Sequence, residues 1–176
     1  MRIISGSHKG RTIIAPKKLP VRPTTDFAKE ALFNILVNQY DMEELKVLDL
    51  FSGTGNIAYE FASRGAKDIT AVDIHLQCYR FIQETADKFN FKSIHAIKAD
   101  VFQYLKKCTT TFNIIFADPP YNHEKTNEIA PLVFEKYILK ENGRFILEHS
   151  PEQDFSKEVH FLERRNYSKV NFSIFG

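Results

Sequence analysis

Short apolar runs alternate with amphipathic segments along most of the chain, and their spacing predicts strands and helices in turn. Strands are predicted at 46–51, 68–73, 93–98, 112–117 and 144–148. Helices are predicted between them at 56–63, in the segment that places Tyr79, Ile82, Ala86 and Phe89 on one face, at 101–107, and in a stretch ending near Tyr137. This repetition is typical of a doubly wound, mostly parallel sheet with helices on both faces.

The two ends of the chain depart from this repetition. Residues 158–165 and 168–175 alternate apolar and polar positions, which predicts an antiparallel strand pair with a tight turn near Asn166 and Tyr167. Near the start, 11–15 predicts a short strand that could form a hairpin with 2–5. A helix follows at 26–40, capped by Thr25 or Asp26. It is predicted to dock on the main domain through Phe27, Ala31, Leu32, Ile35 and Leu36.

Length and composition fit one globular domain at 1–176, with 43% hydrophobic and 26% charged residues. No apolar run is long enough to span a membrane, and the two cysteines have neither disulfide density nor metal-ligand spacing. We therefore expect a cytoplasmic monomer without a metal. Its predicted parts are an N-terminal arm at 1–25, a docking helix at 26–40 and a core at 45–176.

Charge is distributed unevenly, although the net charge is only +2. No acidic residue precedes Asp26, whereas the arm carries Arg2, Lys9, Arg11, Lys17, Lys18 and Arg22. A solvated basic tail is one interpretation of this segment. The other is an arm that grips the phosphates of a nucleic acid.

A glycine loop follows the first predicted strand and opens a helix. Gly53 and Gly55 satisfy a loose dinucleotide-binding pattern, so the loop alone does not identify a cofactor. Asp49, however, lies inside the apolar strand just before the loop. A buried carboxylate suits a cationic ligand better than a pyrophosphate. S-adenosylmethionine, with its ammonium and sulfonium groups, fits Asp49 better than NAD does.

Four acids stand at the ends of four successive predicted strands, namely Asp49, Asp73, Asp100 and Asp118. Ligands of open α/β sheets bind at these carboxyl ends. Asp73 has the position of a ribose-binding acid, and Asp100 could meet an adenine amino group while Val101 or Phe102 packs on the ring. Taken singly, Asp49 could be a structural acid bonded to loop amides, Asp73 a solvated acid, and Asp100 an ordinary helix cap.

The turn Asp118-Pro119-Pro120-Tyr121 follows the strand at 112–117. Proline cannot continue the sheet, which frees a backbone carbonyl beside the carboxylate to accept hydrogen bonds from an exocyclic NH2 group. The Tyr121 ring could stack on a base. The turn therefore indicates a site for a planar amine, and it is otherwise only a strand-ending turn with a surface tyrosine.

Taken together, these segments closely resemble the RsmD family of 16S rRNA guanine-N2 methyltransferases. The matching segments are 2–6, 9–11, 22–26, 30–34, 47–55 and 118–121. The glycine and Pro-Pro motifs occur in many methyltransferases, whereas Arg-Pro-Thr-Thr-Asp at 22–26 is more particular to this family. The resemblance extends from the first residue to about position 150.

The resemblance implies a Rossmann-like class I fold with a seven-stranded sheet, and methyl transfer from S-adenosylmethionine to guanine 966 of small-subunit RNA, in an assembled particle. The implied cofactor contacts are Asp49, Phe51, Gly53, Gly55, Asp73, Asp100 and Val101. The implied catalytic residues are Asp118, Pro119, Pro120 and Tyr121. Contacts to the RNA are expected from Arg2, Lys9, Arg11, Arg22, Thr24 and Thr25.

Three positions depart from the family pattern. Phe27 stands where arginine is frequent, Asp73 replaces a glutamate, and Tyr167 lacks a following glycine. Other activities also stay open at this point. They are methylation of DNA adenine N6 or of a protein glutamine amide, noncatalytic RNA binding, and NAD-dependent oxidoreduction, for which a proton-transfer partner is not apparent.

Overall fold

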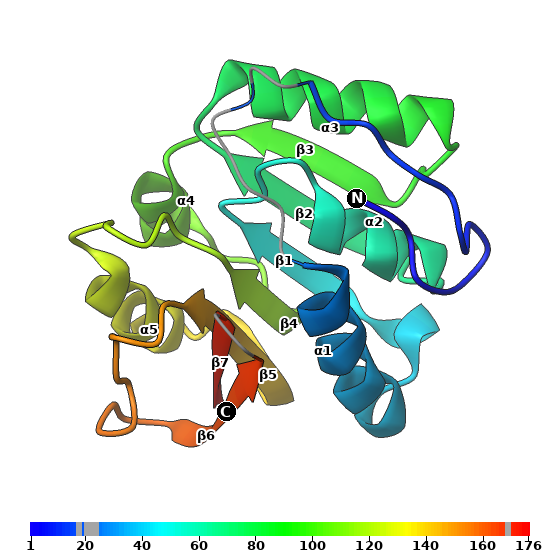
Figure 1. Cartoon of the computed structure of the whole chain (residues 1–176). Coiled ribbons are helices and arrows are strands. Elements are labelled where there is room, and N and C mark those ends of the chain that lie inside the picture. The colour runs from blue at the N-terminus through cyan, green and yellow to red at the C-terminus, as the bar shows by residue number, and fades with distance from the viewer. Residues whose placement is uncertain (17–18, 20–24, 168–169) are drawn as a thin grey trace.

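A seven-stranded sheet forms the centre of the computed structural model, which describes residues 1–16, 19, 25–167 and 170–176 (Figure 1). The strand order is β3-β2-β1-β4-β5-β7-β6. Strands β1 to β5 are parallel, and β7 is antiparallel to both of its neighbours. The strands are β1 (Lys46–Leu50), β2 (Asp68–Asp73), β3 (Ile94–Lys98), β4 (Phe112–Ala117), β5 (Leu139–His149), β6 (Phe161–Tyr167) and β7 (Val170–Phe175). The doubly wound, mostly parallel sheet with an antiparallel C-terminal pair is confirmed.

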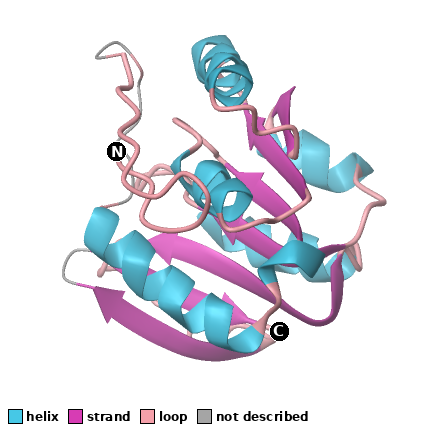
Figure 2. Cartoon of the chain, turned by 90° about the vertical axis from the view of Figure 1, so that its right-hand side faces the viewer, coloured by secondary structure: helices cyan, strands magenta, loops and turns pink. Residues whose placement is uncertain are grey.

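Helices cover both faces of this sheet (Figures 1 and 2). They are α1 (Asp26–Gln39), the short 3-10 helix η1 (Met42–Glu44), α2 (Asn56–Ser63), α3 (Leu76–Lys88), α4 (Val101–Lys107) and α5 (Thr126–Glu135). One core cluster packs α1, α2 and α3 on one face, and a second packs α4 and α5 on the other. Successive side chains of β1 point to opposite faces of the sheet, so Val47 belongs to the first cluster and Leu48 to the second.

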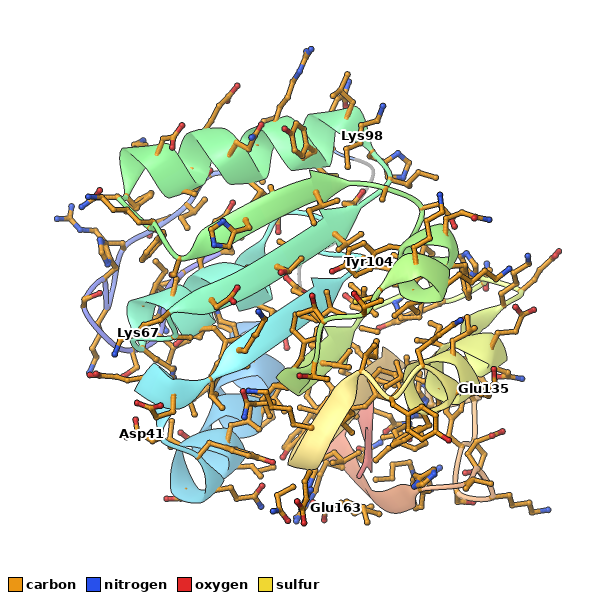
Figure 3. All side chains as sticks on the ribbon, turned by 180° about the vertical axis from the view of Figure 1, so that it is seen from behind. Asp41, Lys67, Lys98, Tyr104, Glu135 and Glu163 are labelled. Atoms are coloured by element: carbon orange, nitrogen blue, oxygen red, sulfur yellow. The ribbon has the colours of Figure 1, made fainter. Side chains whose placement is uncertain are left out.

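Charged side chains such as those of Lys67 and Glu135 lie at the periphery and are exposed (Figure 3). Among the described residues, no helix is both long and apolar enough to cross a membrane. Because β1 to β5 run in parallel, their carboxyl ends meet at one edge of the sheet, which we call the carboxyl edge. The loops that follow these strands therefore converge there.

The C-terminal strands differ from the prediction in their bounds. β5 begins at Leu139 rather than at residue 144, and its pairing with β4 shifts register between Phe112 and Ile114. Asn166 and Tyr167, near which the tight turn was predicted, are the last residues of β6 and pair with Asn171 and Val170, so β6 extends two residues beyond its predicted end. A pattern of alternating residues fixes which side chains share a face, but not where a strand begins.

The docking helix α1 buries a different face from the one predicted. Leu32 and Leu36 are buried as expected, but Phe27 is 68% exposed. Ala28 and Phe33 are fully buried instead. The buried face of α1 is therefore rotated by about one residue from the predicted face, so that Ala28 is buried in place of Phe27. The predicted cap is confirmed, because the Thr25 hydroxyl accepts a hydrogen bond from the backbone N–H of Ala28 at 3.2 Å.

The first residues of the chain are packed against the core, so a solvated tail is the wrong interpretation for this part of the arm. Ile3 and Ile13 are buried in a small third cluster with Tyr59 and Phe91. The predicted pairing of 11–15 with 2–5 is confirmed in part. One antiparallel bridge joins Arg2 to Thr12, and next to it the N–H of Ile3 donates to the Arg11 carbonyl at 2.9 Å and the N–H of Ile13 to the Met1 carbonyl at 3.0 Å. Ile3 and Ile13 pack against α2 and the segment after α3, whereas Ile14 is 85% exposed.

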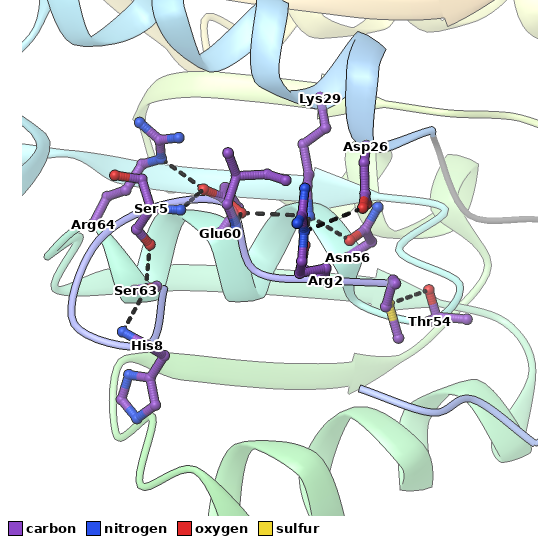
Figure 4. A network of polar contacts seen from close by, with 12 residues as sticks. Arg2, Ser5, His8, Asp26, Lys29, Thr54, Asn56, Glu60, Ser63 and Arg64 are labelled. Atoms are coloured by element: carbon purple, nitrogen blue, oxygen red, sulfur yellow. Dashed lines mark hydrogen bonds and ion pairs between the residues drawn. The ribbon is translucent and has the colours of Figure 1, made fainter. Parts of the chain in front are cut away.

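Polar contacts attach the same segment to α2 (Figure 4). The backbone N–H groups of Ile4 and Ser5 donate to the two carboxylate oxygens of Glu60 at 2.8 and 3.0 Å. Further along, the N–H of His8 donates to the Ser63 hydroxyl at 3.0 Å. Gly6 has φ of +84°, and an added Cβ would lie 1.8 Å from the Ser63 carbonyl oxygen. Only glycine allows this close approach.

A buried lysine connects α1 to α2 and to the N-terminal segment (Figure 4). Lys29 is fully buried, and its Nζ donates to the Asn56 side chain at 2.8 Å and to the Arg2 carbonyl at 2.7 Å. Its Nζ also lies 3.4 Å from Glu60, whose other oxygen pairs with Arg64 at 2.8 Å. We call Lys29, Asn56, Glu60 and Arg64 the buried ion network.

Candidate active site

Asp49 lies in the central strand β1, between β2 and β4, and is 2% exposed. Its Oδ2 atom has no hydrogen-bond partner among the described residues. Burial raises the pKa of the Asp49 carboxyl to about 8, although the backbone N–H of Ala58 lowers it, and the nearby Asp73 carboxylate adds to the rise. A buried carboxyl with an unpaired oxygen is a site for a hydrogen-bonding cation.

The glycine loop bends sharply above Asp49. Phe51 has φ of +55°, a left-handed conformation that costs a non-glycine residue roughly 1–2 kcal/mol. Gly55 has φ of +77° and begins α2, and an added Cβ would lie 2.7 Å from the Tyr59 ring. The loop backbone thus packs closely on Tyr59 and leaves its outer side for a ligand. Strain of this kind is concentrated at binding sites.

Asp73 shapes the glycine loop from the end of β2. Its Oδ2 accepts from the backbone N–H of Gly53 at 2.8 Å, and its Oδ1 accepts from that of His75 at 2.8 Å. Asp73 is 5% exposed. Each carboxylate oxygen can accept a second hydrogen bond, so these contacts leave acceptor capacity for a hydroxyl.

Asp100 caps α4, as the alternative interpretation of this residue expected. Its Oδ1 accepts from the backbone N–H of Gln103 at 2.9 Å. The neighbouring Val101 is 2% exposed and belongs to the core cluster beneath α4. The structure therefore establishes a structural task for both residues, and their contact with a cofactor stays a prediction.

Asp118 follows β4 and is close to a second carboxylate that the sequence reasoning missed. Burial of Asp118, with the nearby carboxylates of Glu148 and Asp49, raises the pKa of Asp118 well above its ordinary value. Glu148 is 2% exposed near the end of β5. Within the described residues, no cluster of three or more side chains is arranged to hold a metal ion. The carboxyl edge therefore concentrates negative charge.

The Pro-Pro turn leaves one carbonyl available. His123 donates its backbone N–H to the Pro120 carbonyl at 2.8 Å, whereas no described residue donates to the Pro119 carbonyl. Pro119 is buried and Pro120 is exposed. Tyr121 is 48% exposed, so part of its ring reaches solvent. The turn thus presents a carboxyl, a carbonyl and a ring at one edge, as a planar amine requires.

An aromatic cluster stands beside the turn, and the sequence reasoning did not anticipate it. The His123 ring stacks on Phe102 of α4, with centroids 5.3 Å apart and planes at 22°. Phe51 meets the same His123 ring edge-on at 5.6 Å. The three rings come from three separate loops or helices, so only the fold brings them together. They form an apolar wall next to the acids.

The predicted RNA-binding residues are dispersed. Arg2 pairs with Asp26 at 3.6 Å, close to the start of α1, whereas Lys9 lies beyond the far end of α2, where Ser7 and His8 are bonded to Ser63. Arg11 is exposed, and Thr25 is committed to capping α1. Arg22 and Thr24 lie outside the described residues. Contact of any of these residues with RNA stays a prediction.

His149 is buried at the end of β5 and has two hydrogen-bonding contacts. Its Nε2 lies 2.8 Å from the Ser173 hydroxyl and its Nδ1 lies 2.9 Å from the Ser150 carbonyl. The missed Glu148 precedes it directly. A signal for Glu148 was present, because the strand predicted at 144–148 ends on this acid. It is a fifth acid at the end of a parallel strand.

This strand order, with acids and a glycine loop at the carboxyl edge, defines a Rossmann-like class I methyltransferase fold. A solved structure described as a putative methyltransferase yhhF from Escherichia coli has the same fold, with a TM-score of 0.86. It is 23% identical, and the superposition covers 99% of this chain and 96% of that one.

Sequence comparison then identifies the family. The family described as Conserved hypothetical protein 95 matches residues 1–176. The putative rRNA methyltransferase YlbH of Bacillus subtilis is 35% identical over 90% of this chain and 88% of its own length. Ribosomal RNA small subunit methyltransferase D of Buchnera aphidicola is 32% identical over 84% of this chain and 75% of its own length. The chain belongs to this family, and the resemblance to RsmD is confirmed.

Proposed function

We propose that this protein transfers a methyl group from S-adenosylmethionine to the exocyclic N2 of a guanine in 16S ribosomal RNA. The observation that carries the proposal is the carboxyl edge, where the Asp118–Tyr121 turn lies next to the buried Asp49. Similarity to proteins named as rRNA methyltransferases supports the choice of substrate.

The residues of the glycine loop fit S-adenosylmethionine. This donor carries an ammonium, a sulfonium and no phosphate, and it supplies an electrophilic methyl group. The Oδ2 atom of Asp49, which has no partner among the described residues, suits a cation. Gly55 has φ of +77° and allows the tight turn that brings the loop backbone next to this carboxyl. Asp73 has acceptor capacity for ribose hydroxyls. The adenine would be held near Asp100, Val101 and Phe51.

Asp118 and the Pro119 carbonyl would orient the acceptor amine. The amine nitrogen is a weak nucleophile because its lone pair is conjugated with the guanine ring. Hydrogen bonds from its two protons to these acceptors would hold it in line with the donor, and Tyr121 would stack on the base. On methylation, the nitrogen must release one proton. The raised pKa of Asp118 makes its carboxylate a stronger proton acceptor than an ordinary aspartate.

The finer identity of the substrate rests on the family resemblance. We propose guanine 966 in an assembled small-subunit particle as the target, modified by a cytoplasmic monomer. Little protein lies outside the sheet and its helices, so recognition of RNA shape suits the chain better than reading of a long sequence. The base must leave any stack before it reaches the turn.

Labelled-methyl transfer tests the proposal. Small subunits and naked 16S rRNA from undermethylated cells are incubated with the protein and labelled S-adenosylmethionine, and the nucleosides are identified by mass spectrometry. We expect N2-methylguanosine, with more label on the assembled subunits. Label in N6-methyladenosine or in protein glutamine would contradict the proposed acceptor. The Asp118→Ala variant provides the background.

A further inference from the structure

Two aromatic rings meet on the surface where α1 begins and β6 ends. The ring centroids of Phe27 and Tyr167 are 6.1 Å apart, with planes at 77°. We call these two residues the surface aromatic pair. Phe27 is 68% exposed, so burial against its neighbour recovers little of the free energy that a phenylalanine gains in a core. Packing alone therefore does not account for a phenylalanine at this position.

Buried aromatic residues of the core pack against this pair. The Tyr167 ring is tilted against Phe172, with centroids 5.7 Å apart. Phe172 is 1% exposed and in turn meets Phe116 of β4 edge-on at 6.2 Å. A line of contacting rings therefore connects the interior of the sheet to Phe27. Isolated surface hydrophobic residues are common and need no explanation, but a ring supported in this way is held in place.

Strand register places Tyr167 at the carboxyl edge. Tyr167 pairs with Val170, and the next residue of β7, Asn171, pairs with His149 at the end of β5. Glu148, whose carboxylate raises the pKa of Asp118, directly precedes His149. Tyr167 consequently lies just past the strand end that carries the acids.

Contacts of α1 place Phe27 at the same edge. Two residues further along, Lys29 bonds to Asn56, which directly follows the glycine loop. The start of α1 and the end of β6 lie side by side in Figure 2, in agreement with the ring contact. The surface aromatic pair thus lies at the same edge of the sheet as the Asp118–Tyr121 turn.

We propose that the surface aromatic pair is a stacking platform for an unpaired base of the RNA, next to the base that is methylated. The inference rests on the proposed function and adds a second base-binding position to it. Proteins hold single-stranded RNA by stacking bases on exposed aromatic rings. Arg2 pairs with Asp26, the residue before Phe27, at 3.6 Å. The two rings themselves carry no charge, so what they offer to the RNA is stacking.

Substitutions of the pair test the platform. Phe27→Leu keeps an apolar side chain but removes the ring, and Tyr167→Ala removes the second ring. Each is expected to weaken binding of a short single-stranded RNA, and to raise the KM for the RNA substrate, on the order of 5- to 100-fold. The affinity for S-adenosylmethionine and the kcat at saturating RNA should be unchanged. Phe27→Trp should restore or tighten binding.

A matched control and a salt titration separate stacking from other causes. Tyr137 is 84% exposed and lies just before β5, at the opposite edge of the sheet, so Tyr137→Ala should leave RNA binding unchanged. The slope of log affinity against log salt should stay the same in Phe27→Leu, because no phosphate contact is lost.

Besides a complete absence of RNA binding, four outcomes would overturn the inference. They are wild-type affinity in both variants, an equal loss in Tyr137→Ala, a changed salt slope, and loss of a dimer on sedimentation, which would assign the pair to a second copy of this chain. Binding and methylation are measured separately. RNA binding that depends on Phe27, without N2-methylguanosine, would reject the proposed function and support the platform, whereas absence of RNA binding would reject the platform.

Discussion

The buried ion network and the acids of the carboxyl edge both place ionisable groups in the interior, but they differ in how those groups are compensated. Glu60 accepts two backbone N–H groups and pairs with Arg64 and Lys29. Asp49 keeps one oxygen without a partner among the described residues, and Asp118 faces another carboxylate. The network runs along one short helix, α2, from Asn56 to Arg64, and this helix begins directly after the glycine loop of the carboxyl edge.

This difference separates structure from function. Each charge of the network is satisfied within the protein, so the network holds α1, α2 and the N-terminal segment together. At the edge, the Oδ2 atom of Asp49 has no partner among the described residues, and Asp118 is buried near other carboxyl groups, so the ligand-free protein carries the cost of burying these two groups. The functional site is therefore marked by buried ionisable groups that lack a compensating partner, and not by buried ionisable groups in general. Four substitutions test this contrast.

Asp118→Ala should have the largest effect. Loss of the carboxylate that orients the amine and accepts its proton is expected to slow methyl transfer roughly 100- to 10,000-fold. Single-turnover transfer of labelled methyl to RNA measures this rate, and calorimetry should find the affinity for S-adenosylmethionine little changed. The Asp118→Asn variant keeps one acceptor oxygen, so its methyl-transfer rate should lie between those of the wild type and Asp118→Ala. Wild-type turnover in Asp118→Ala would reject the assignment.

Lys29→Met should be costly for stability and not directly for chemistry. Removing the ammonium leaves Glu60 short of a partner in the interior, which typically costs about 3–5 kcal/mol in free energy of unfolding. Urea unfolding measures the loss. The matched control is Lys67→Met, because this exposed lysine lies 3.8 Å from Glu43 and should contribute less than about 1 kcal/mol. Adding Glu60→Gln to Lys29→Met should recover part of the loss, and equal losses in the two single variants would contradict the network.

Asp49→Asn should make stability less dependent on pH. The pKa of Asp49 is about 8 in the folded protein, against 3.8 for an ordinary aspartate. Between these values the folded chain holds a proton that the unfolded chain has released, so the free energy of unfolding falls as pH rises from about 4 to about 8. The Asp49→Asn substitution removes this pH-dependent decrease in the free energy of unfolding, which is roughly 2–5 kcal/mol. It should also weaken binding of S-adenosylmethionine.

Urea unfolding of the ligand-free protein at pH 5 and pH 8 checks this prediction. The control is Glu135→Gln, an exposed acid that should leave the pH dependence unchanged. A wild-type pH dependence in Asp49→Asn would mean that Asp49 is charged in the ligand-free protein, and the contrast with the network would then fail.

Asp100→Ala should have the smallest effect on stability and separates two roles of one residue. Loss of the cap on α4 is expected to cost about 1 kcal/mol. Asp100→Ser can still cap the helix but has no carboxylate, so it should restore thermal stability without restoring affinity for S-adenosylmethionine in calorimetry. Full affinity in Asp100→Ser would leave Asp100 as a cap alone.

Patterns along the chain were sufficient for the sheet because parallel strands are buried on both faces. The run at 112–117 is apolar at nearly every position and could hardly be anything but an interior strand. The acids at strand ends were visible for the same reason, since each interrupts or ends such a run. Glu148 satisfies this criterion as well, although it is a glutamate and the four predicted acids are aspartates.

Tertiary contacts decided what the sequence left undetermined. Lys29 is a charged residue, which predicts a surface position in α1, and its burial is explained by the Glu60 carboxylate that pairs with it. The contact of Phe51 and Phe102 with His123 depends on three segments far apart in the chain. Helical periodicity assigned Phe27 to the buried face of α1. Phe27 is exposed instead, because the buried face of α1 is rotated by about one residue from the predicted one.

The position of Gly6 against Ser63 also has a consequence for the order in which the chain folds. A nascent chain emerges from its N-terminus, so residues 2–8 are made long before Glu60 and Ser63, the groups that receive their hydrogen bonds. Residues 2–8 can therefore dock only after α2 has been synthesised and has formed. Arg2, together with Lys9 and Arg11 just beyond it, is unmatched by any acid before Asp26, and these charges keep the segment hydrated during that interval.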